Sequence, residues 1–150
     1  MKRGELLSKA IRLATTAHDG QFDKAGMPYI LHPLKVLYNT KSEDEEIQCI
    51  AVLHDVVEDC DVTWADLESE GFTSRIIEGV RALTKQHGQS YAEYKQAVFA
   101  NRDAMLVKLA DLRHNTDIRR LKGVTERDRA RILRYHEFAF EIQSKLREAK

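Results

Sequence analysis

Apolar residues recur at helical spacing along most of the chain. In residues 5–18, leucine, isoleucine and alanine return every three or four positions, which predicts a helix with one face in a core. The same spacing predicts helices over residues 29–39, 73–86, 90–101 and 103–121. No stretch of alternating apolar and polar residues competes with them. The sequence therefore predicts an all-α fold, a single helical bundle.

Residues that start or stop helices mark the expected boundaries. Ser42 followed by Glu45 is typical of a capping box and predicts a third helix, which runs through Val57 and carries residues 58 and 59. Gly and Pro in residues 20–28 predict a loop, and Pro33 fits the first turn of the helix that follows. The remaining expected boundaries are a short helix from Thr63 to near Gly71, a break at Gly123, and a last helix opened by Thr125 and Asp128 that runs to about residue 147.

The composition narrows the class of protein. The 150 residues, 43% hydrophobic and 32% charged, fit one globular domain spanning residues 1–150. Lys+Arg and Asp+Glu both number 24, so general attraction to nucleic acid or membranes has no basis, and the oligomeric state stays open. We see no signal peptide in the sequence. No apolar run approaches the roughly 18 residues that a membrane span needs. Cys49 and Cys60 make no disulfide framework, so we expect a cytoplasmic protein.

The expected third helix carries ionisable residues in an apolar stretch. His54-Asp55 follows four apolar residues, and Glu58-Asp59 follows two more. Positions four apart share a helix face, so one histidine and three carboxylates form one patch. Carboxylates removed from water are costly unless they are paired. Either this patch faces water or it holds a cation, and the histidine favours a divalent transition metal.

Two other segments could complete a metal site. Asp111 interrupts an apolar helix, with Asn115 one turn later, and His32 precedes Pro33. Each alone has an ordinary alternative, a solvated carboxylate or a packed histidine. Together, His32, His54, Asp55 and Asp111 would supply two imidazoles and two carboxylates, a set that suits Mn²⁺, Fe²⁺ or a similar ion with water in the open positions.

Four segments of the sequence together resemble a known family. Residues 17–21 read AHDGQ, residues 24–34 read KAGMPYILHPL, residues 53–59 read LHDVVED, and residues 108–111 read KLAD with Asn115 following. In order and spacing this pattern resembles the HD superfamily, and within it the hydrolase domain of RelA/SpoT-type alarmone enzymes, especially the small stand-alone (p)ppGpp hydrolases. The resemblance spans roughly residues 10–120.

The resemblance implies an activity and a set of site residues. It implies an α-helical HD domain that hydrolyses the 3′-pyrophosphate of (p)ppGpp to GDP or GTP plus pyrophosphate, without the synthetase domain of longer members. It also implies a role for each matching position: Mn²⁺ ligands at His32, His54, Asp55 and Asp111, an acidic pair at Glu58 and Asp59 that activates water, and substrate contacts at Lys24, Asn115 and Tyr135.

One departure from the family's pattern concerns the substrate. Asp23 stands where alarmone hydrolases commonly have arginine, which removes a forked phosphate ligand and adds a repelling charge. Two alternatives therefore stay open: an HD phosphohydrolase for another nucleotide or phosphorylated metabolite, and a ligand sensor without activity. His18 and His114 are expected to be capping, surface or packing residues and not ligands. The basic run 127–134 is expected to be a solvated helix face, with a place over the substrate pocket as its alternative.

Overall fold

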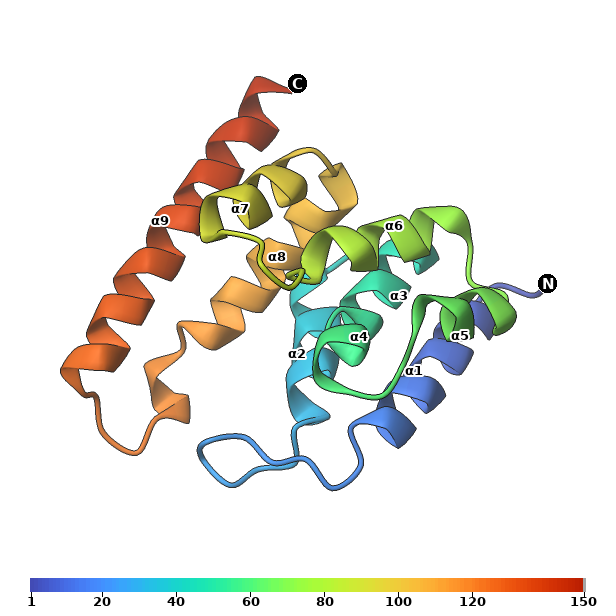
Figure 1. Ribbon diagram of the computed structural model, residues 1–150, viewed down its shortest axis with the longest axis horizontal. Coiled ribbons are helices and arrows are strands. Elements are labelled where there is room, and N and C mark those ends of the chain that lie inside the picture. The colour runs from blue at the N-terminus through green and yellow to red at the C-terminus, as the bar shows by residue number, and fades with distance from the viewer. Residues whose placement is uncertain (150) are drawn as a thin grey trace.

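Helices joined by short loops make up residues 1–149, the part of the chain that the computed structural model describes (Figure 1). This confirms the all-α prediction; within residues 1–149 the one strand-like feature is an isolated bridge between Phe22 and Pro28. The elements in order are α1 (Glu5–Ala17), α2 (Leu31–Thr40), α3 (Glu45–Leu53), α4 (Val56–Asp59), α5 (Trp64–Ser69), α6 (Ser74–Leu83), α7 (Tyr91–Phe99), α8 (Arg102–Asn115), the 3-10 helix η1 (Ile118–Arg120) and α9 (Glu126–Glu148).

Helix α3 is the centre of the core. Six of its nine residues are buried, and α1, α2, α6 and α8 all pack against it. Helix α6 comes especially close, because it has Gly79 where it crosses Ile50: a Cβ at residue 79 would lie 2.4 Å from Ile50 Cδ1. The buried apolar run 50–53 thus anchors the end of α3 in the core, directly before the polar residues His54 and Asp55.

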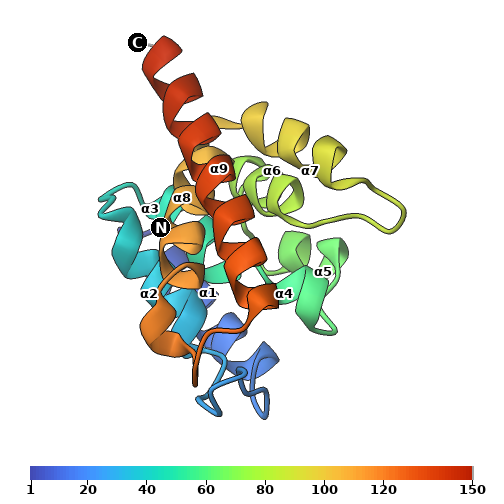
Figure 2. The ribbon, with the colours of Figure 1, turned by 90° about the vertical axis from the view of Figure 1, so that its left-hand side faces the viewer.

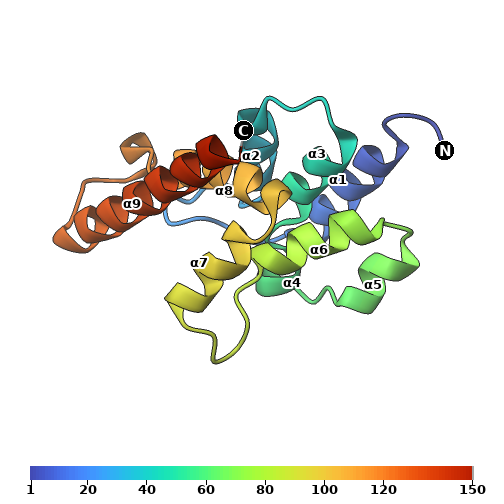
Figure 3. The same ribbon diagram turned by 90° about the horizontal axis from the view of Figure 1, so that it is seen from above.

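Helix α9 lies on the opposite side of the molecule from α1, with α8 beside it (Figures 1 and 3). It is held by Phe138, which is fully buried and meets the rings of Tyr91, Tyr94 and Phe99 edge-on. The loop over residues 18–30 and the loop over residues 116–125 lie at the same end of the bundle (Figure 2). Among the helices of residues 1–149, none combines the length and the apolarity of a membrane span.

The prediction of one continuous third helix is wrong, because the helix breaks at His54 and Asp55. Helix α3 ends at Leu53 and α4 begins at Val56. The His54 imidazole donates from Nδ1 to the carbonyl of Ala51 at 2.7 Å, which is the carbonyl that the N–H of Asp55 would bond in a continuous helix. The competing side-chain bond accounts for the break, and it places His54 and Asp55 at a bend.

The predicted capping box at Ser42 is also wrong. Asp44 caps α3, accepting from the N–H of Glu46. The carboxylate of Glu45 reaches instead to the start of α1, where it accepts from the N–H groups of Gly4 at 2.7 Å, Leu6 at 2.9 Å and Leu7 at 3.2 Å. Glu45 therefore caps a helix that is distant in the sequence.

The helix predicted over residues 103–121 is shorter than expected. Helix α8 ends at Asn115, and η1 follows at Ile118. The Thr116 hydroxyl donates to the Leu112 carbonyl, and Asp117 caps η1 by accepting from the N–H of Arg119. Such local bonds compete with helix continuation. The helix starts expected at Thr63 and at Thr125 with Asp128 are confirmed, each with a capping box, and Pro33 lies in the first turn of α2 as predicted.

Candidate metal centre

Four of the residues singled out from the sequence meet in the interior. Helix α2 contributes His32, the bend between α3 and α4 contributes His54 and Asp55, and α8 contributes Asp111. The Nε2 atom of His32 lies 2.9 Å from Asp111 Oδ1 and 3.7 Å from Asp55 Oδ2. The Nε2 atom of His54 lies 3.1 Å from Asp55 Oδ2 and 3.4 Å from Asp111 Oδ1. Two ligand atoms bound at right angles to one ion at about 2.1 Å are separated by roughly 3 Å, so these spacings fit one shared cation.

The imidazole of His54 can offer a lone pair to this centre when a cation takes the place of the Nε2 proton. Its Nδ1 donates to the Ala51 carbonyl, which leaves Nε2 without a proton in the neutral ring. That Nε2 is buried and has no hydrogen-bond partner. A buried nitrogen lone pair beside two carboxylate oxygens is the donor set that a divalent transition metal needs, so the residues fit the expected ion.

His114 lies against His32, the other histidine of the candidate centre. Its Nδ1 lies 2.7 Å from Nδ1 of His32, and the two rings stack with centroids 5.0 Å apart. Burial and the Arg120 charge lower the pKa of His114 to about 4, so its ring is neutral at pH 7. To bind a cation through Nε2, His32 would carry its single proton on Nδ1 and donate it to Nδ1 of His114. His114 packs, as expected, but its part in the site was missed; its place three residues after Asp111 on one helix face was the available signal.

Each carboxylate of the centre has a second partner that keeps it ionised and oriented. Asp111 receives the Lys108 ammonium at 2.8 Å and the Asn115 amide at 3.0 Å. Asp55 receives the Tyr29 hydroxyl at 2.6 Å. Burial raises the pKa of Asp111, but Lys108 and the imidazoles hold it well below its usual range.

Burial and neighbouring charges also oppose each other in setting the pKa values of Asp55 and His54. Burial raises the pKa of Asp55, yet the adjacent His54 brings it to about 2. In return, and against the effect of burial, Asp55 and Asp111 raise the pKa of His54 well above its ordinary value. Two ionised carboxylates facing an imidazole therefore favour a positive charge at this point.

The acidic pair Glu58 and Asp59 lies beside the centre. Asp55, Glu58 and Asp59 each offer an oxygen within 4.8 Å of the others. Glu58 Oε1 accepts from the backbone N–H of Lys85 at 2.7 Å, which fixes that carboxylate. Burial and the charges of Asp55 and Glu58 raise the pKa of Asp59 to about 6. Asp59 can therefore take up or release a proton near neutral pH.

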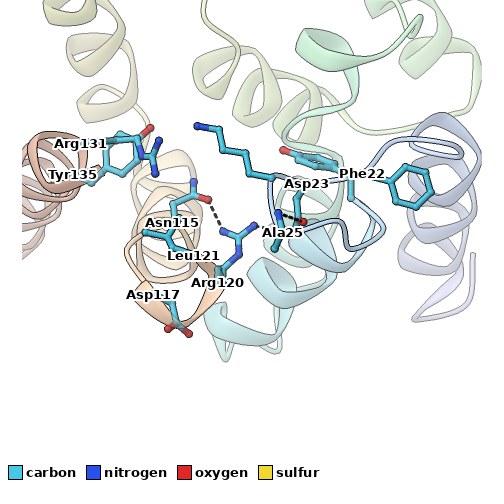
Figure 4. A pocket seen from close by; sticks show the side chains of 11 residues that line it. Phe22, Asp23, Ala25, Asn115, Asp117, Arg120, Leu121, Arg131 and Tyr135 are labelled. Atoms are coloured by element: carbon cyan, nitrogen blue, oxygen red, sulfur yellow. Dashed lines mark hydrogen bonds and ion pairs between the residues drawn. The ribbon is translucent and has the colours of Figure 1, made fainter. Parts of the chain in front are cut away.

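A cleft of about 440 Å³ adjoins the centre, between the loop over residues 18–30, the end of α8 with η1, and α9 (Figure 4). It is lined by the three side chains expected to contact substrate, Lys24, Asn115 and Tyr135. Two lining residues also contact the candidate metal centre, because Tyr29 donates to Asp55 and Asn115 donates to Asp111. A ligand in this cleft would thus lie next to the four converging side chains.

Arginines that the motifs did not single out add positive charge to the cleft. Arg131 lines it and pairs with Asp128 at 2.8 Å, so for this residue of the basic run the alternative position over the pocket is the observed one. Arg120, which the sequence analysis missed, also lines it and lies 3.6 Å from Asp23. The carboxylate of Asp23 is therefore paired with a cation.

Comparison with known protein families and proteins shows what this chain is similar to. The family model described as HD domain matches residues 10–139. The protein named guanosine-3′,5′-bis(diphosphate) 3′-pyrophosphohydrolase MESH1, from Danio rerio, is 34% identical over 155 residues, which cover 95% of this chain and 84% of that protein. Two longer bacterial relatives are a guanosine-3′,5′-bis(diphosphate) 3′-pyrophosphohydrolase of Vibrio cholerae, 36% identical over 73% of this chain, and the bifunctional (p)ppGpp synthase/hydrolase SpoT of Escherichia coli, 32% identical over 85%.

The relatives differ from this chain in length, and a solved structure shares its fold. The chain covers 16% of the Vibrio cholerae protein and 20% of the Escherichia coli protein. A solved structure described as a metazoan ortholog of SpoT that hydrolyzes ppGpp superimposes with a TM-score of 0.76 at 24% identity, covering 99% of this chain and 95% of that one. This similarity shows that the helical arrangement is common to both.

Proposed function

The chain belongs to the HD domain family, and from this premise we propose that it is a metal-dependent hydrolase of guanosine alarmones. The proposed reaction removes the 3′-pyrophosphate of (p)ppGpp and yields GDP or GTP plus pyrophosphate. The relatives named as 3′-pyrophosphohydrolases support the substrate, above all the Danio rerio protein, which aligns over nearly the whole chain.

One structural observation carries the proposal: the cleft and the metal centre share side chains. Tyr29 and Asn115 line the cleft and also donate to Asp55 and Asp111, which are two of the proposed ligands. A nucleotide held by Lys24 and Tyr135 would therefore lie with a phosphate group beside the centre. Tyr135 offers an aromatic face for the base, and Lys24 offers a charge for phosphate oxygens.

The proposed cofactor is Mn²⁺ or another divalent transition metal, held by His32, His54, Asp55 and Asp111. Two nitrogen and two oxygen donors suit such an ion. When bound, it supplies Lewis-acid polarisation of a phosphoryl oxygen and lowers the pKa of water.

The chain's own residues would move the proton. Asp59, with a pKa near 6, can accept a proton from the attacking water, while Glu58, fixed by the Lys85 N–H, orients that water. The bond between phosphorus and the 3′ oxygen breaks, the water oxygen stays with the released pyrophosphate, and a proton completes the 3′-hydroxyl. Lys24 would neutralise phosphate charge in the cleft throughout.

The proposed setting follows from size and charge. A cleft of about 440 Å³ fits a small nucleotide, and the balanced charge of the chain gives no electrostatic basis for general attraction to nucleic acid or membranes. Both cysteines are free thiols, which agrees with the cytoplasm as the proposed compartment.

Pyrophosphate release from ppGpp in the presence of Mn²⁺ tests the proposal. We expect release by the wild type and a loss of more than about 100-fold in His54→Ala and Asp55→Ala, because each removes a ligand atom from the centre. His136→Ala, a change of an exposed histidine on α9, is the matched control and should keep activity. Activity in the two ligand variants equal to wild type would reject the metal centre.

A substrate panel separates the proposal from its alternatives. It should contain ppGpp, pppGpp, other nucleotides and a generic phosphodiester. Hydrolysis of another member but not of the alarmones would identify an HD phosphohydrolase with a different substrate. Binding of metal without hydrolysis of any member would identify a sensor.

A further inference from the structure

The guanidinium of Arg120, on η1, lines the cleft. Arg120 Nη1 donates to the Asn115 side-chain oxygen at 3.0 Å and to the His114 carbonyl at 3.3 Å. Its Nη2 lies 3.6 Å from Asp23 Oδ2, across from α8 on the loop over residues 18–30. Figure 4 shows Arg120 between Asn115 and Asp23, with Arg131 and Tyr135 beyond Asn115 at the left. The contacts on Nη1 fix the position of the side chain, and the contact on Nη2 balances its charge.

Another anion can replace Asp23 as the partner of Arg120. A separation of 3.6 Å is longer than a good charged hydrogen bond, so Nη2 retains donors for a stronger acceptor. Asp23 is held independently, because its Oδ1 accepts from the N–H groups of Ala25 and Met27 at 2.9 Å each. The loop therefore does not depend on Arg120 for its shape, and Arg120 can turn to another anion without disturbing it.

We propose that Arg120 is a specificity-determining residue of this cleft: its guanidinium binds a phosphate group of the nucleotide, and Asp23 restrains that binding by competing for the same guanidinium. A phosphate offers two oxygens in the geometry that a guanidinium matches, which the distant Asp23 carboxylate does not. The inference rests on the proposed function for the class of ligand and adds the residue pair that sets its phosphate affinity.

The two partners have opposite predicted effects, which makes the pair testable. Removing the guanidinium removes an attraction, so phosphate binding weakens. Removing the Asp23 charge while keeping an acceptor oxygen for the N–H groups of Ala25 and Met27, as in Asp23→Asn, frees Arg120 and removes a repulsion, so phosphate binding strengthens. A residue pair that only stabilised the cleft would weaken binding in both variants.

Calorimetric titration with guanosine, GDP and GTP measures this without hydrolysis, since neither nucleotide carries a 3′-pyrophosphate. For Arg120→Ala we expect GTP affinity to fall about 10- to 100-fold, with guanosine affinity unchanged. For Asp23→Asn we expect GTP affinity to rise about threefold or more. Arg119→Ala is the matched control, because Arg119 is the neighbouring arginine of η1, is 86% exposed and pairs with Asp117 instead. Its GTP affinity should stay within about twofold of wild type.

Manganese binding to Arg120→Ala, titrated in parallel, checks that the variant keeps the neighbouring centre. With manganese affinity retained, equal GTP affinity in wild type and Arg120→Ala would overturn the inference, as would wild type that binds neither GDP nor GTP. Weaker GTP binding in Asp23→Asn would overturn the restraint by Asp23. If wild type hydrolyses ppGpp while Arg120→Ala binds GTP normally, the inference fails and the proposed function stands. If Arg120→Ala loses GTP affinity while wild type leaves ppGpp intact, the inference stands and the proposed function fails.

Discussion

At the scale of single residues, the centre depends on side chains that orient the proposed ligands as much as on the ligands. Tyr29 donates to Asp55 at 2.6 Å, and its pKa lies far above its ordinary value because of burial and the Asp55 charge, so it remains a donor. His114 Nδ1 lies 2.7 Å from His32 Nδ1 and, as the acceptor of its proton, would leave His32 Nε2 for the proposed ion. Partners of this kind commonly contribute 10- to 100-fold to metal affinity.

Tyr29→Phe isolates one such partner. The change removes a single oxygen and keeps the ring that contacts His18 and His32. We expect manganese affinity, measured by calorimetric titration, to fall about 10-fold, because Asp55 loses the donor that orients it.

Tyr38→Phe is the matched control for this change, because the Tyr38 side chain is 82% exposed on α2. Its manganese affinity should equal that of wild type. Equal affinity in Tyr29→Phe and wild type would mean that Asp55 is oriented without the hydroxyl.

The sequence marks the proposed ligands better than their partners. His54, Asp55 and Asp111 interrupt apolar helices, and that conflict between residue type and surroundings is visible without a structure. Tyr29 and Arg120 are ordinary residues in loops or short helices, and their roles depend on contacts with residues 26 and 97 positions away along the chain. Spacing along the chain carries no information on such contacts.

At the scale of elements, the wrong boundaries share one physical cause: side chains bonded to backbone groups that helix periodicity ignores. His54 takes the Ala51 carbonyl and ends α3, and Asp117 starts η1 where a continuous helix was predicted. In the first case the apolar run 50–53 stays fully buried, whereas in the second Ile118, an apolar position of the predicted helix, is 57% exposed. Periodicity therefore predicts which segments are helical more reliably than where they bend.

Glu45 provides a test of capping between elements. Three backbone N–H groups, Gly4 first, lower the pKa of Glu45 below its ordinary value of 4.5. A carboxyl whose pKa is lowered on folding contributes stability above its unfolded pKa and loses it as the pH falls through the folded pKa. We therefore expect Glu45→Gln to have a lower melting temperature than wild type at pH 7, and the gap to close progressively below about pH 4.5.

Glu43→Gln makes the same charge change on an exposed neighbour and serves as the control. Thermal melts followed by circular dichroism across this pH range measure both variants. A gap for Glu45→Gln that is independent of pH would show that the negative charge of Glu45 is not what stabilises the start of α1.

The close crossing of α6 over α3 gives a second prediction at this scale. A Cβ on Gly79 would lie 2.4 Å from Cδ1 and 2.9 Å from Cγ1 of Ile50, which is fully buried. Overpacking of this kind costs about 1–3 kcal/mol, and the better helix propensity of alanine returns up to about 1 kcal/mol. Gly79→Ala should therefore lower the free energy of unfolding by about 1–2 kcal/mol in urea titrations.

Ile50→Val supplies the control for that crossing, because it removes the Cδ1 atom that meets the new methyl group. Alone it should cost about 0.5–1.5 kcal/mol. Combined with Gly79→Ala, the total loss should be smaller than the sum of the two single losses. Additive losses would place the strain elsewhere on α6.

At the scale of the whole molecule, the proposed ligands connect segments that are far apart in the sequence. His32 lies on α2, His54 and Asp55 lie at the end of α3, and Asp111 lies on α8. Helices α2, α3 and α8 pack against one another, so the centre lies where these three helices meet. An ion held there would join three helices, whereas α9, on the far side of α8, contributes only to the cleft.

Manganese binding should therefore raise global stability. At a free concentration of 100 times its dissociation constant, a ligand bound to the folded state adds about 2.7 kcal/mol, which corresponds to a rise in melting temperature of about 5–10 °C for a chain of this length. Asp55→Asn removes one ligand charge and keeps an acceptor for the Tyr29 hydroxyl, so its melting temperature should barely respond to manganese. In hydrogen exchange, the added protection of wild type should appear in α2, α3 and α8. Protection confined to α9 would place the bound ion outside the four converging side chains.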